Sequence, residues 1–588
     1  MSGGEGEAGT IVTELRVLRR APEGGSEHVE QHDLQVATFT QMTFCNGCGQ
    51  LLVGVARQGL RCCKCGLCLH ARCVAAAAPL HACKVSACAP TPPGCQPWGA
   101  HQWVAGNTHL VPRAWPPIAP APGAHPLLAV FGTPLFASPT SCMVCGAHAG
   151  SASRLADRRC VWCHRVCHSE GRCGDEGDAM PCTLGPLSSL IAPPNLVART
   201  HVTTSTSTST TDTSSSSEFY LRAPPAGYPV LTPLVCFINS KSGAQEGVAV
   251  RRQLEGVLNP LQVFDLVEEG AVPGPARGLR FVREFYPDAF RVLVCGGDGT
   301  FGWVLEELRR LGLAPAIAVL PLGTGNDLPR SLGWGGGFDP GSGDVAEVLL
   351  ALLDPARVQP QPLDRWAVHT EPRYEGQQLV PQPQDRMVNN YWSIGLDAKI
   401  ALDFHRARQS DPAAFNGRFT NKVQYVKFAT LDFIGPNTTL LAGRIELYVD
   451  GAPVPVPADA QALVVLNLPS CYGGRNLWGD TLTPEERARG WTPAALDDMK
   501  LEIVAIRNTV QLGEINTGLA LPHKVAQGQD VRVRLLSQDE QRERIDTATE
   551  KPCAEIPCQF DGEPYLQPMD CSVVFTHVQQ ARMLRRLP

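Results

Sequence analysis

At 588 residues the chain is too long for one hydrophobic core, so two to four domains are expected. Its formal net charge of −6 is small and its lysines and arginines are scattered, which gives no sign of a nucleic-acid partner. No run approaches the roughly 18 apolar residues that a membrane span requires, and the first ten residues lack a secretory pattern. We therefore expect a cytoplasmic protein.

The 23 cysteines are concentrated near the start of the chain, where 17 of them lie between Cys45 and Cys182. Many have the short CxxC spacing that suits zinc better than disulfides, which favours a reducing compartment.

In chain order, residues 1–30 are rich in Gly, Glu and Ser and are expected to be disordered, although TELRVLRR (13–20) favours a short helix. Two cysteine-rich modules follow at 31–90 and 98–190, the second with a Pro/Ala-rich loop insertion from Pro112 to Pro139. Residues 195–230 contain a tract of Ser and Thr that cannot bury apolar surface, so they are expected to be a linker.

Residues 231–366 alternate between apolar strand patterns and amphipathic helix patterns, as in LVCFIN, RRQLEGVL, RVLVC, FGWVLEELRRLG and AIAVL. This alternation predicts an α/β domain with a parallel sheet. Residues 367–580 read mainly as strands, including RIELYV, ALVVLNL, KLEIVAI, DVRVRLL and CQFDGE, and predict a mostly β lobe.

Each cysteine-rich module supplies eight residues of zinc-ligand type, enough for two tetrahedral sites of three thiolates and one imidazole each. Such short segments have little core, so metal binding would provide much of their folding free energy. The candidate ligands are His32, Cys45, Cys48, Cys62, Cys65, His70, Cys73 and Cys83 in the first module, and His101, Cys142, Cys145, Cys160, Cys163, His168, Cys173 and Cys182 in the second.

The strongest local signal is RVLVCGGDGTFGWVLEELRRLG, a strand followed by a glycine-rich turn and a helix. Gly296, Gly297 and Gly299 would let the backbone approach phosphate oxygens, and the helix N-terminus would add free N–H groups. The turn is neither a Walker loop nor the dinucleotide fingerprint.

Two further predicted strands end in similar residues. AIAVL leads into Gly323, Thr324, Gly325 and Asn326, and LVCFIN ends in a turn that contains Asn239 and Lys241. Because successive parallel strands end at one edge of a sheet, these three corners are expected to converge on a nucleotide triphosphate. Lys241 is predicted to neutralise phosphate charge or to be a solvated loop lysine.

The segment HDLQVATFTQMTFCNGCGQLLVGVARQGLRCCKCGLCLHARC closely resembles the diacylglycerol/phorbol-ester type of zinc finger. The resemblance implies interleaved ligands, with His32, Cys62, Cys65 and Cys83 on one zinc and the other four on the second. His81 stands where the family has its final cysteine, so either His81 or Cys83 could close that site.

The same resemblance implies an apolar rim that contacts diacylglycerol in membranes. Leu51, Leu52, Val53 and Val55 would form this rim, with Gln58 bracing the loops. Met42 replaces a common proline and Val53 a common aromatic, so a structural or protein-binding role stays open.

The second module, with HQWVAGN and RRCVWCHRVCH, resembles the extended cysteine-rich domain of diacylglycerol kinases. It lacks the apolar rim, so diacylglycerol binding is not expected there, and Cys167 is an alternative ligand to Cys173.

From about Pro233 to Thr576 the chain resembles the catalytic and accessory domains of eukaryotic diacylglycerol kinases. The motifs include GGDGTxGWVL, PLGTGNDLPRxLGWG, LDRW, NNYWSIGLDAKIALDFH, LNLPSCYGGRNLWG and FDGEPYLQP. The chain is therefore expected to carry two small zinc-stabilised fingers followed by a two-lobed lipid kinase with an α/β nucleotide-binding lobe and a mostly β accessory lobe.

The resemblance implies ATP and Mg²⁺ as cofactors, structural Zn²⁺, and phosphorylation of 1,2-diacylglycerol to phosphatidic acid. Gly296, Gly297, Gly299 and Thr300 would hold the phosphates, and the corner from Gly323 to Asn326 would lie nearer the nucleoside. Asp298 would organise phosphate or metal, and Asp561 or Glu563 would be the general base. Asp497 and Asp498 resemble a structural magnesium segment whose glycine is replaced by Met499.

Two other functions remain possible on the sequence alone. The chain could be a kinase for another lipid alcohol of the sphingosine or ceramide type, or an inactive diacylglycerol-binding adaptor. For the enzyme we expect reversible membrane association, diacylglycerol in membranes as partner, and no nucleic acid.

Overall fold

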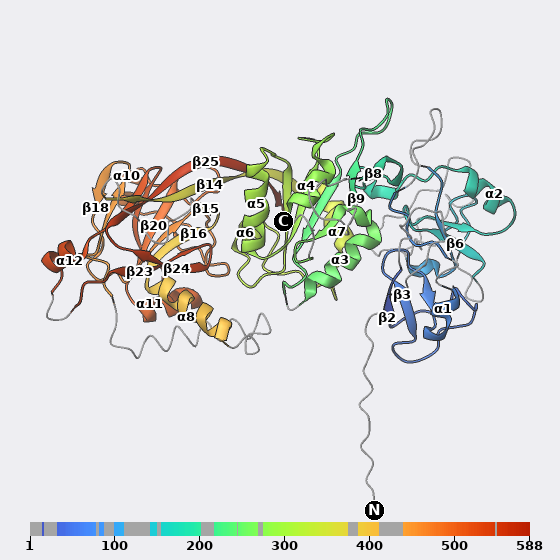
Figure 1. Cartoon of the computed structure of the whole chain (residues 1–588), viewed down its shortest axis with the longest axis horizontal. Helices are drawn as coiled ribbons and strands as arrows, with labels where there is room; N and C mark the ends of the chain where they lie inside the picture. The colour runs from blue at the N-terminus through green and yellow to red at the C-terminus, as the bar shows by residue number, and fades with distance from the viewer. Residues whose placement is uncertain are drawn as a thin grey trace, which may run out of the picture.

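The computed structural model describes residues 15–16, 32–77, 81–87, 99–110, 141–149, 155–201, 217–243, 245–268, 274–373, 386–410, 439–546 and 550–588. The zinc modules, the α/β lobe and the β-rich lobe follow one another along the long axis (Figure 1). Leu15–Arg16 form strand β1 beside β2, so the short helix expected there is wrong, and these two residues are not disordered. The rest of residues 1–30 lies outside the described residues, as does the insertion from Pro112 to Pro139.

The two zinc modules are small antiparallel sheets with one short helix each. The first orders its strands β1-β2-β3-β4, and the second orders them β5-β6-β7. The elements of the first are β2 (Asp33–Ala37), β3 (Gly59–Cys62), β4 (Cys68–Leu69) and α1 (Val74–Ala77), and those of the second are β5 (Trp103–Ala105), β6 (Asp157–Cys160), β7 (Val166–His168) and α2 (Gly171–Ala179).

The expected linker is partly structured. Strands β8 (Val197–His201) and β9 (Ser217–Leu221) pair as an antiparallel hairpin, and Val197 and Leu221 are buried. The Tyr286 hydroxyl donates to the Arg222 carbonyl and ties the hairpin to the α/β lobe. Sequence reasoning failed here because the Ser/Thr tract hid the short apolar segments on either side of it.

The α/β lobe contains the predicted parallel sheet, in the order β11-β10-β12-β13. Every residue of β10 is buried, as expected for a parallel strand covered by helices on both faces. Strand β11 and helices α4 and α7 were not predicted. The elements are β10 (Leu234–Ile238), β11 (Val263–Asp265), β12 (Arg291–Gly296), β13 (Ala316–Pro321), α3 (Glu246–Val257), α4 (Ala276–Arg283), α5 (Asp298–Arg310), α6 (Asp327–Ser331) and α7 (Val345–Leu353).

The second lobe is mostly β, as predicted, and packs two sheets around one apolar core. Strands β17 and β22 alternate buried and half-buried residues, the pattern of strands with one face on a core. The strands are β14 (Val358–Pro372), β15 (Arg386–Val388), β16 (Tyr391–Gly395), β17 (Ile445–Val449), β18 (Ala452–Val454), β19 (Ala462–Leu466), β20 (Leu501–Ile506), β21 (His523–Gly528), β22 (Val531–Leu535), β23 (Glu555–Phe560), β24 (Glu563–Pro568) and β25 (Cys571–Arg586). The helices are α8 (Leu396–Ser410), α10 (Pro484–Ala488), α11 (Thr509–Thr517) and α12 (Gln538–Arg544).

Two long strands run through both lobes. β14 and β25 pair antiparallel along nearly their whole length (Figure 1). β25 pairs with β22 in the β-rich lobe, and near its end Met583 is in register with Ile317 of β13. The predicted domain boundaries at 366 and 580 therefore fall inside strands that join the lobes into one sheet.

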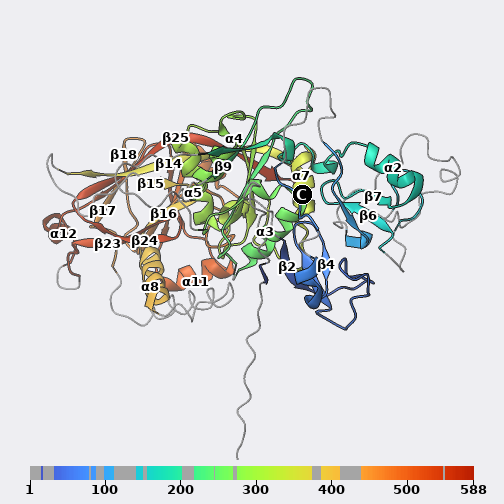
Figure 2. The same ribbon diagram turned by 45° about the vertical axis from the view of Figure 1, so that its right-hand side comes forward.

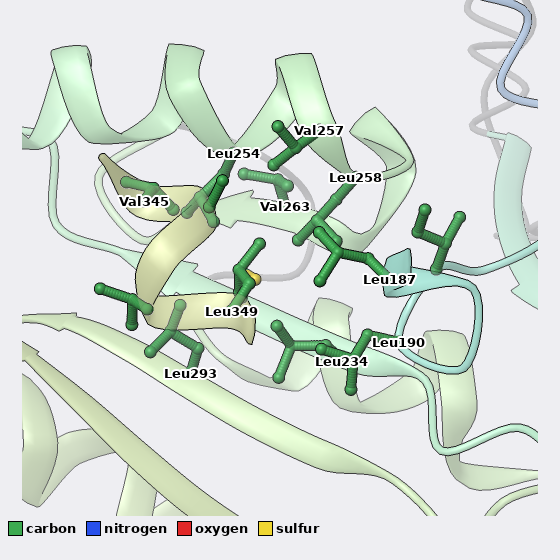
Figure 3. Close-up of a cluster of buried hydrophobic side chains, with 14 of the residues drawn as sticks. Leu187, Leu190, Leu234, Leu254, Val257, Leu258, Val263, Leu293, Val345 and Leu349 are labelled. Carbon is green, nitrogen blue, oxygen red and sulfur yellow. The ribbon is translucent and has the colours of Figure 1, made fainter. Parts of the chain in front are cut away.

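The core of the α/β lobe includes residues that precede it in the sequence. Leu187 and Leu190, at the end of the range 98–190 assigned to the second zinc module, are fully buried and lie against Leu258 and Leu234 (Figure 3). Gln262 Nε2 donates to the carbonyls of Leu190 and Leu234. The zinc modules are therefore anchored to the lobe by shared core.

Candidate active site and zinc centres

The three glycine-rich corners meet at the carboxyl edge of the parallel sheet, as predicted. A Cβ built on Gly323 would lie 2.6 Å from the Cα of Gly297, so the second and third corners touch backbone to backbone. Leu322 N–H donates to the Gly296 carbonyl at 2.7 Å. Only glycine allows this approach, and it leaves a surface made of backbone groups beside the N-terminus of α5.

The first corner joins the other two through a side chain. Asn239 Nδ2 donates to the Thr300 hydroxyl at 3.3 Å, and Asn239 Oδ1 accepts from the Lys241 backbone N–H. The side chain of Lys241 is exposed at the end of this turn. Asn239 and Thr300 thus connect the corners, while Lys241 is free to reach a bound anion.

Asn326 lies behind the third corner rather than in it. It is fully buried with a left-handed backbone, and its amide donates to the carbonyls of Gly323 and Gly336. These contacts hold the turn in shape, whereas the sequence predicted that Asn326 helps to bind ATP on the nucleoside side.

Asp298 begins α5 and caps the start of α6. Its two carboxylate oxygens accept the backbone N–H groups of Asp327 and Leu328, at 3.1 and 3.2 Å. Burial and the nearby Asp327 carboxylate raise the pKa of Asp298 to about 6. Asp298 therefore links the second and third corners and titrates near the physiological range.

Asp327 is a site residue that sequence reasoning did not assign. Its carboxylate accepts from the Ser470 hydroxyl at 2.8 Å and from the backbone N–H groups of Gly473 and Gly474. These donors lie in the segment LNLPSCYGGRNLWG. Its resemblance to a diacylglycerol kinase motif was the signal from which a site contact could have been predicted. The contacts fix the β-rich lobe against the third corner.

Asp561 is held in a tight turn between β23 and β24 and makes four hydrogen bonds. It accepts from the backbone N–H groups of Asn389, Asn390 and Tyr391, and from the Asn389 side chain. Burial raises the pKa of this carboxyl, and the N–H donors oppose that shift. With its oxygens directed at these donors, Asp561 shapes the turn that carries Glu563.

Glu563, in the β-rich lobe, faces the second corner in the α/β lobe. Its Oε1 lies 3.8 Å from the position of a Cβ on Gly299. The side chain is exposed, and no hydrogen bond or ion pair ties it to another described residue. Of the two predicted base candidates, Glu563 is the one whose carboxylate is unengaged beside the glycine corners.

A buried arginine connects the two lobes beside these residues. Arg365, in the motif LDRW of β14, donates to the Leu305 carbonyl of α5 and to Asn389 Oδ1, both at 3.0 Å. Asn389 in turn donates to Asp561. The chain of contacts from α5 through Arg365 sets the distance between the glycine corners and the Asp561 turn.

The zinc modules bring their predicted ligands together in four clusters, each with ligand atoms within 4.8 Å of one another. The clusters are His32, Cys62, Cys65 and Cys83; Cys45, Cys48, His70 and Cys73; His101, Cys160, Cys163 and Cys182; and Cys142, Cys145, His168 and Cys173. Each offers three thiols and one imidazole, the donor set of a structural zinc site.

The two alternative ligands lie outside these clusters. The backbone carbonyl of His81 is 2.9 Å from His32 Nε2, so it fixes the ring of a ligand while Cys83 completes the cluster. Cys167 donates its thiol to the Cys173 carbonyl. Asp497 and Asp498 belong to no such cluster among the described residues, and Met499 has the left-handed backbone that favours glycine.

The predicted apolar rim of the first finger is only partly right. Val55 and Val53 are 99% and 75% exposed, but Leu52 is 5% exposed and packs into the finger. Gln58 accepts from Phe39 N–H and donates to the carbonyls of Phe39 and Gly54, so it braces the two loops. The exposed apolar tip consists of Met42, Val53 and Val55.

Comparison with known families agrees with this architecture. Residues 32–84 match the phorbol esters/diacylglycerol binding domain (C1 domain), residues 233–358 the diacylglycerol kinase catalytic domain, and residues 387–564 the diacylglycerol kinase accessory domain. By these matches the chain belongs to the diacylglycerol kinase family, with a C1-type zinc module ahead of the catalytic domain.

Several curated proteins are similar. The probable diacylglycerol kinase 3 of Caenorhabditis elegans is 31% identical over 94% of this chain and 64% of its own length. Diacylglycerol kinase 1 of Arabidopsis thaliana is 38% identical (60% of this chain, 45% of its own), and human diacylglycerol kinase zeta is 33% identical (69% and 43%). The chain thus spans about half to two thirds of the length of these relatives.

A solved putative diacylglycerol kinase from Bacillus anthracis aligns with 60% of this chain and 97% of its own, at 17% identity and a TM-score of 0.35, a likeness too low to carry an argument. No helix among the described residues has the length and apolar character needed to cross a membrane.

Proposed function

We propose that this chain transfers the γ-phosphoryl group of ATP to the primary hydroxyl of 1,2-diacylglycerol, giving phosphatidic acid and ending a diacylglycerol signal. The observation that carries the proposal is the exposed Glu563 carboxylate facing the glycine cradle around Gly297 and Gly299. A carboxylate beside a phosphate cradle is the arrangement that an in-line transfer to an alcohol needs.

We expect the ATP phosphates to contact backbone N–H groups of the corners and of the first turn of α5. This first turn contains Gly299 and Thr300. Lys241 neutralises charge from the first corner. Asp298 and Asp327 hold the third corner in place. Magnesium, when bound with ATP, would neutralise phosphate charge, and the Asp298 carboxylate would hold it through lone pairs that its two backbone hydrogen bonds leave free.

Glu563 is the proposed general base. It would accept the proton of the lipid hydroxyl as the oxygen attacks the γ-phosphorus, and ADP would leave on the opposite side. Asp561 is a positioning residue, since four N–H donors already occupy its carboxylate.

The four Cys₃His clusters are proposed to hold structural zinc, and the first finger is proposed to touch diacylglycerol-containing membranes through Met42, Val53 and Val55. Burying such side chains favours contact by about 25 cal/mol per Å². We propose a cytoplasmic protein that associates reversibly with membranes.

A vesicle assay with radiolabelled ATP tests the reaction. We expect labelled phosphatidic acid from vesicles that contain 1,2-dioleoylglycerol, and none from sphingosine or ceramide. Label in sphingosine or ceramide would favour the alternative lipid kinase, and no label in any lipid would favour the inactive adaptor. Full-length protein is needed, because Leu187 and Leu190 belong to the catalytic core.

A further inference from the structure

A cavity that is open to solvent lies at the C-terminal half of α3, away from the glycine corners. It has a volume of about 640 Å³ and is lined by residues of both zinc modules and of the α/β lobe. Gly247, near the start of α3, contacts the Asn239 corner, whereas Gly256 and Val257, at its end, line this cavity. At 1.5 Å per residue the two sites are roughly 14 Å apart along the helix.

The cavity wall is rich in cations. Arg61 and Lys64 come from the first module, Arg159 from the second and Arg252 from α3. Arg252 is near Asp33, with 3.4 Å between Nε and Oδ2. The other three cations form no ion pair with a carboxylate in the described part of the chain.

Arg159 is the most constrained of these cations. Its side chain is buried, at 2% exposure for the residue, and Nη2 donates to the Cys65 carbonyl at 3.1 Å. A Cβ on Gly66 would lie 2.3 Å from Nη2, so the guanidinium fits against a glycine with no room to move. Its Nε–H has no acceptor among the described residues. Nη1 lies 3.5 Å from His164 Nδ1, so the contacts of the guanidinium are with neutral groups and no carboxylate of the described residues balances its buried charge.

The remaining wall mixes apolar side chains, such as Phe39 and Leu110, with a loop before α7. Residues 340–344 of this loop line the cavity, and Gln253 holds the loop by donating to the Pro340 carbonyl and accepting from Val345 N–H. Asp344 is the acidic residue in the lining, and its carboxylate caps α7 through Ala346 N–H at 2.9 Å. The cavity therefore presents several cations and one carboxylate that is already engaged.

We propose that this cavity binds a phosphate monoester, held by Arg61, Lys64 and Arg159. A phosphate group offers several acceptor oxygens and about two negative charges, which matches forked guanidinium donors and a nearby ammonium. The ligand is either a free phosphate ester or the headgroup of a lipid such as phosphatidic acid. Because it would touch both modules and α3, it would stabilise their docked arrangement by mass action.

Isothermal titration of the full-length, zinc-loaded chain tests this assignment. The catalytic site is first saturated with a non-hydrolysable ATP analogue and Mg²⁺, so that its phosphate cradle is occupied. Glycerol 3-phosphate and inorganic phosphate are the soluble probes. Vesicles of phosphatidylcholine with and without phosphatidic acid are the lipid probes.

We expect the double variant Arg61→Gln/Lys64→Gln to bind the probe that wild type binds at least about tenfold more weakly than wild type does. The control Arg72→Gln, an exposed arginine of the same module outside the cavity lining, should bind like wild type. Binding of soluble phosphate identifies a free ester, and binding of phosphatidic-acid vesicles alone identifies a lipid headgroup.

Thermal unfolding separates ligand binding from a structural role. The probe that binds in the titration should raise the Tm of wild type and Arg72→Gln but not that of the double variant. Without this probe the double variant should be no less stable than wild type, because like charges are removed. The proposal is overturned if no probe binds wild type, if the double variant binds equally well, or if the double variant is destabilised to the same extent with and without the probe.

Discussion

The two ends of α3 lie against surfaces built in different ways. At its start, Gly247 packs against the carbonyl of Asn239, within a strand-turn-helix unit that is continuous in sequence. At its end, the Lys84 ammonium donates to the carbonyls of Glu255, Gly256 and Leu258 from 171 to 174 residues away. Asn259 adds bonds to the Ser86 and Ala192 carbonyls (Figure 2 shows α3 beside the modules).

The proposed catalytic edge and the docking side are built by different means. The proposed catalytic edge depends on missing side chains, because glycine lets backbone donors approach a ligand. The docking side depends on buried polar side chains that satisfy carbonyls at a helix end. Substitutions at the glycine corners should therefore reduce turnover without lowering stability. Substitutions on the docking side should lower stability without reducing turnover.

The largest effect is expected for Gly297→Asp. Its side chain would meet the Gly323 backbone, since a Cβ lies 3.1 Å from the Gly323 Cα, and its charge would repel phosphate. We expect a fall in kcat of more than about a thousandfold, with an unchanged unfolding transition. Gly513→Asp, where a Cβ meets nothing within 4 Å, is the matched control. Retained activity in Gly297→Asp would exclude the cradle.

Glu563→Gln should lower kcat by about a hundredfold or more, because general-base catalysis contributes roughly 10²–10⁴. KM for diacylglycerol should change little. The control Glu555→Gln alters an exposed glutamate of the neighbouring strand β23 and should be active. If Asp561→Asn lowers kcat more than Glu563→Gln does, without loss of stability, then Asp561 is the base and Glu563 the positioning residue.

Activity should fall about tenfold per pH unit below roughly pH 6, where Asp298 becomes protonated and no longer accepts both N–H groups. Because the folded pKa is raised, the contribution of Asp298 to stability is present at low pH and lost as pH rises through about 6, opposite to activity. Profiles of kcat and of unfolding free energy against pH check both signs. Asp327→Asn removes a neighbouring charge, so it should move the loss of activity to lower pH. If the loss stays at the same pH, protonation of Asp298 does not cause it.

Lys84→Met tests the docking side. Three carbonyls lose their donor, so we expect the free energy of unfolding to fall by about 1–3 kcal/mol. Denaturant unfolding measures the loss, and kcat under native conditions should stay within about twofold because α3 touches the active site only at its other end. Arg72→Met is the exposed control. A fall in kcat with unchanged stability would mean that the modules act on catalysis directly.

The smallest effect is expected at the free tip of the first finger. Val53→Ser/Val55→Ser should weaken binding to diacylglycerol-containing vesicles by roughly tenfold, from the lost burial of two exposed side chains. Sedimentation with vesicles measures this. Val510→Ser/Val578→Ser, at half-exposed valines elsewhere, is the control. Equal loss in both double variants would point to unspecific adsorption.

Some features were predictable because the residues that make them are close in sequence. The parallel strands β10, β12 and β13, their glycine corners and the zinc ligands follow from local patterns, since apolar periodicity, backbone freedom and short ligand spacings act over a few residues. The convergence of the corners also followed, because parallel strands end at one edge.

The tertiary structure alone decided how the distant parts combine. Burial of Leu187 and Leu190 in the α/β core, the return of β25 to β13, the choice of Cys83 over His81, and the availability of Glu563 beside an engaged Asp561 all depend on contacts between residues far apart in the chain. Local sequence signals carry no record of such contacts, because each is fixed by packing and hydrogen bonding that exist only once the lobes have assembled.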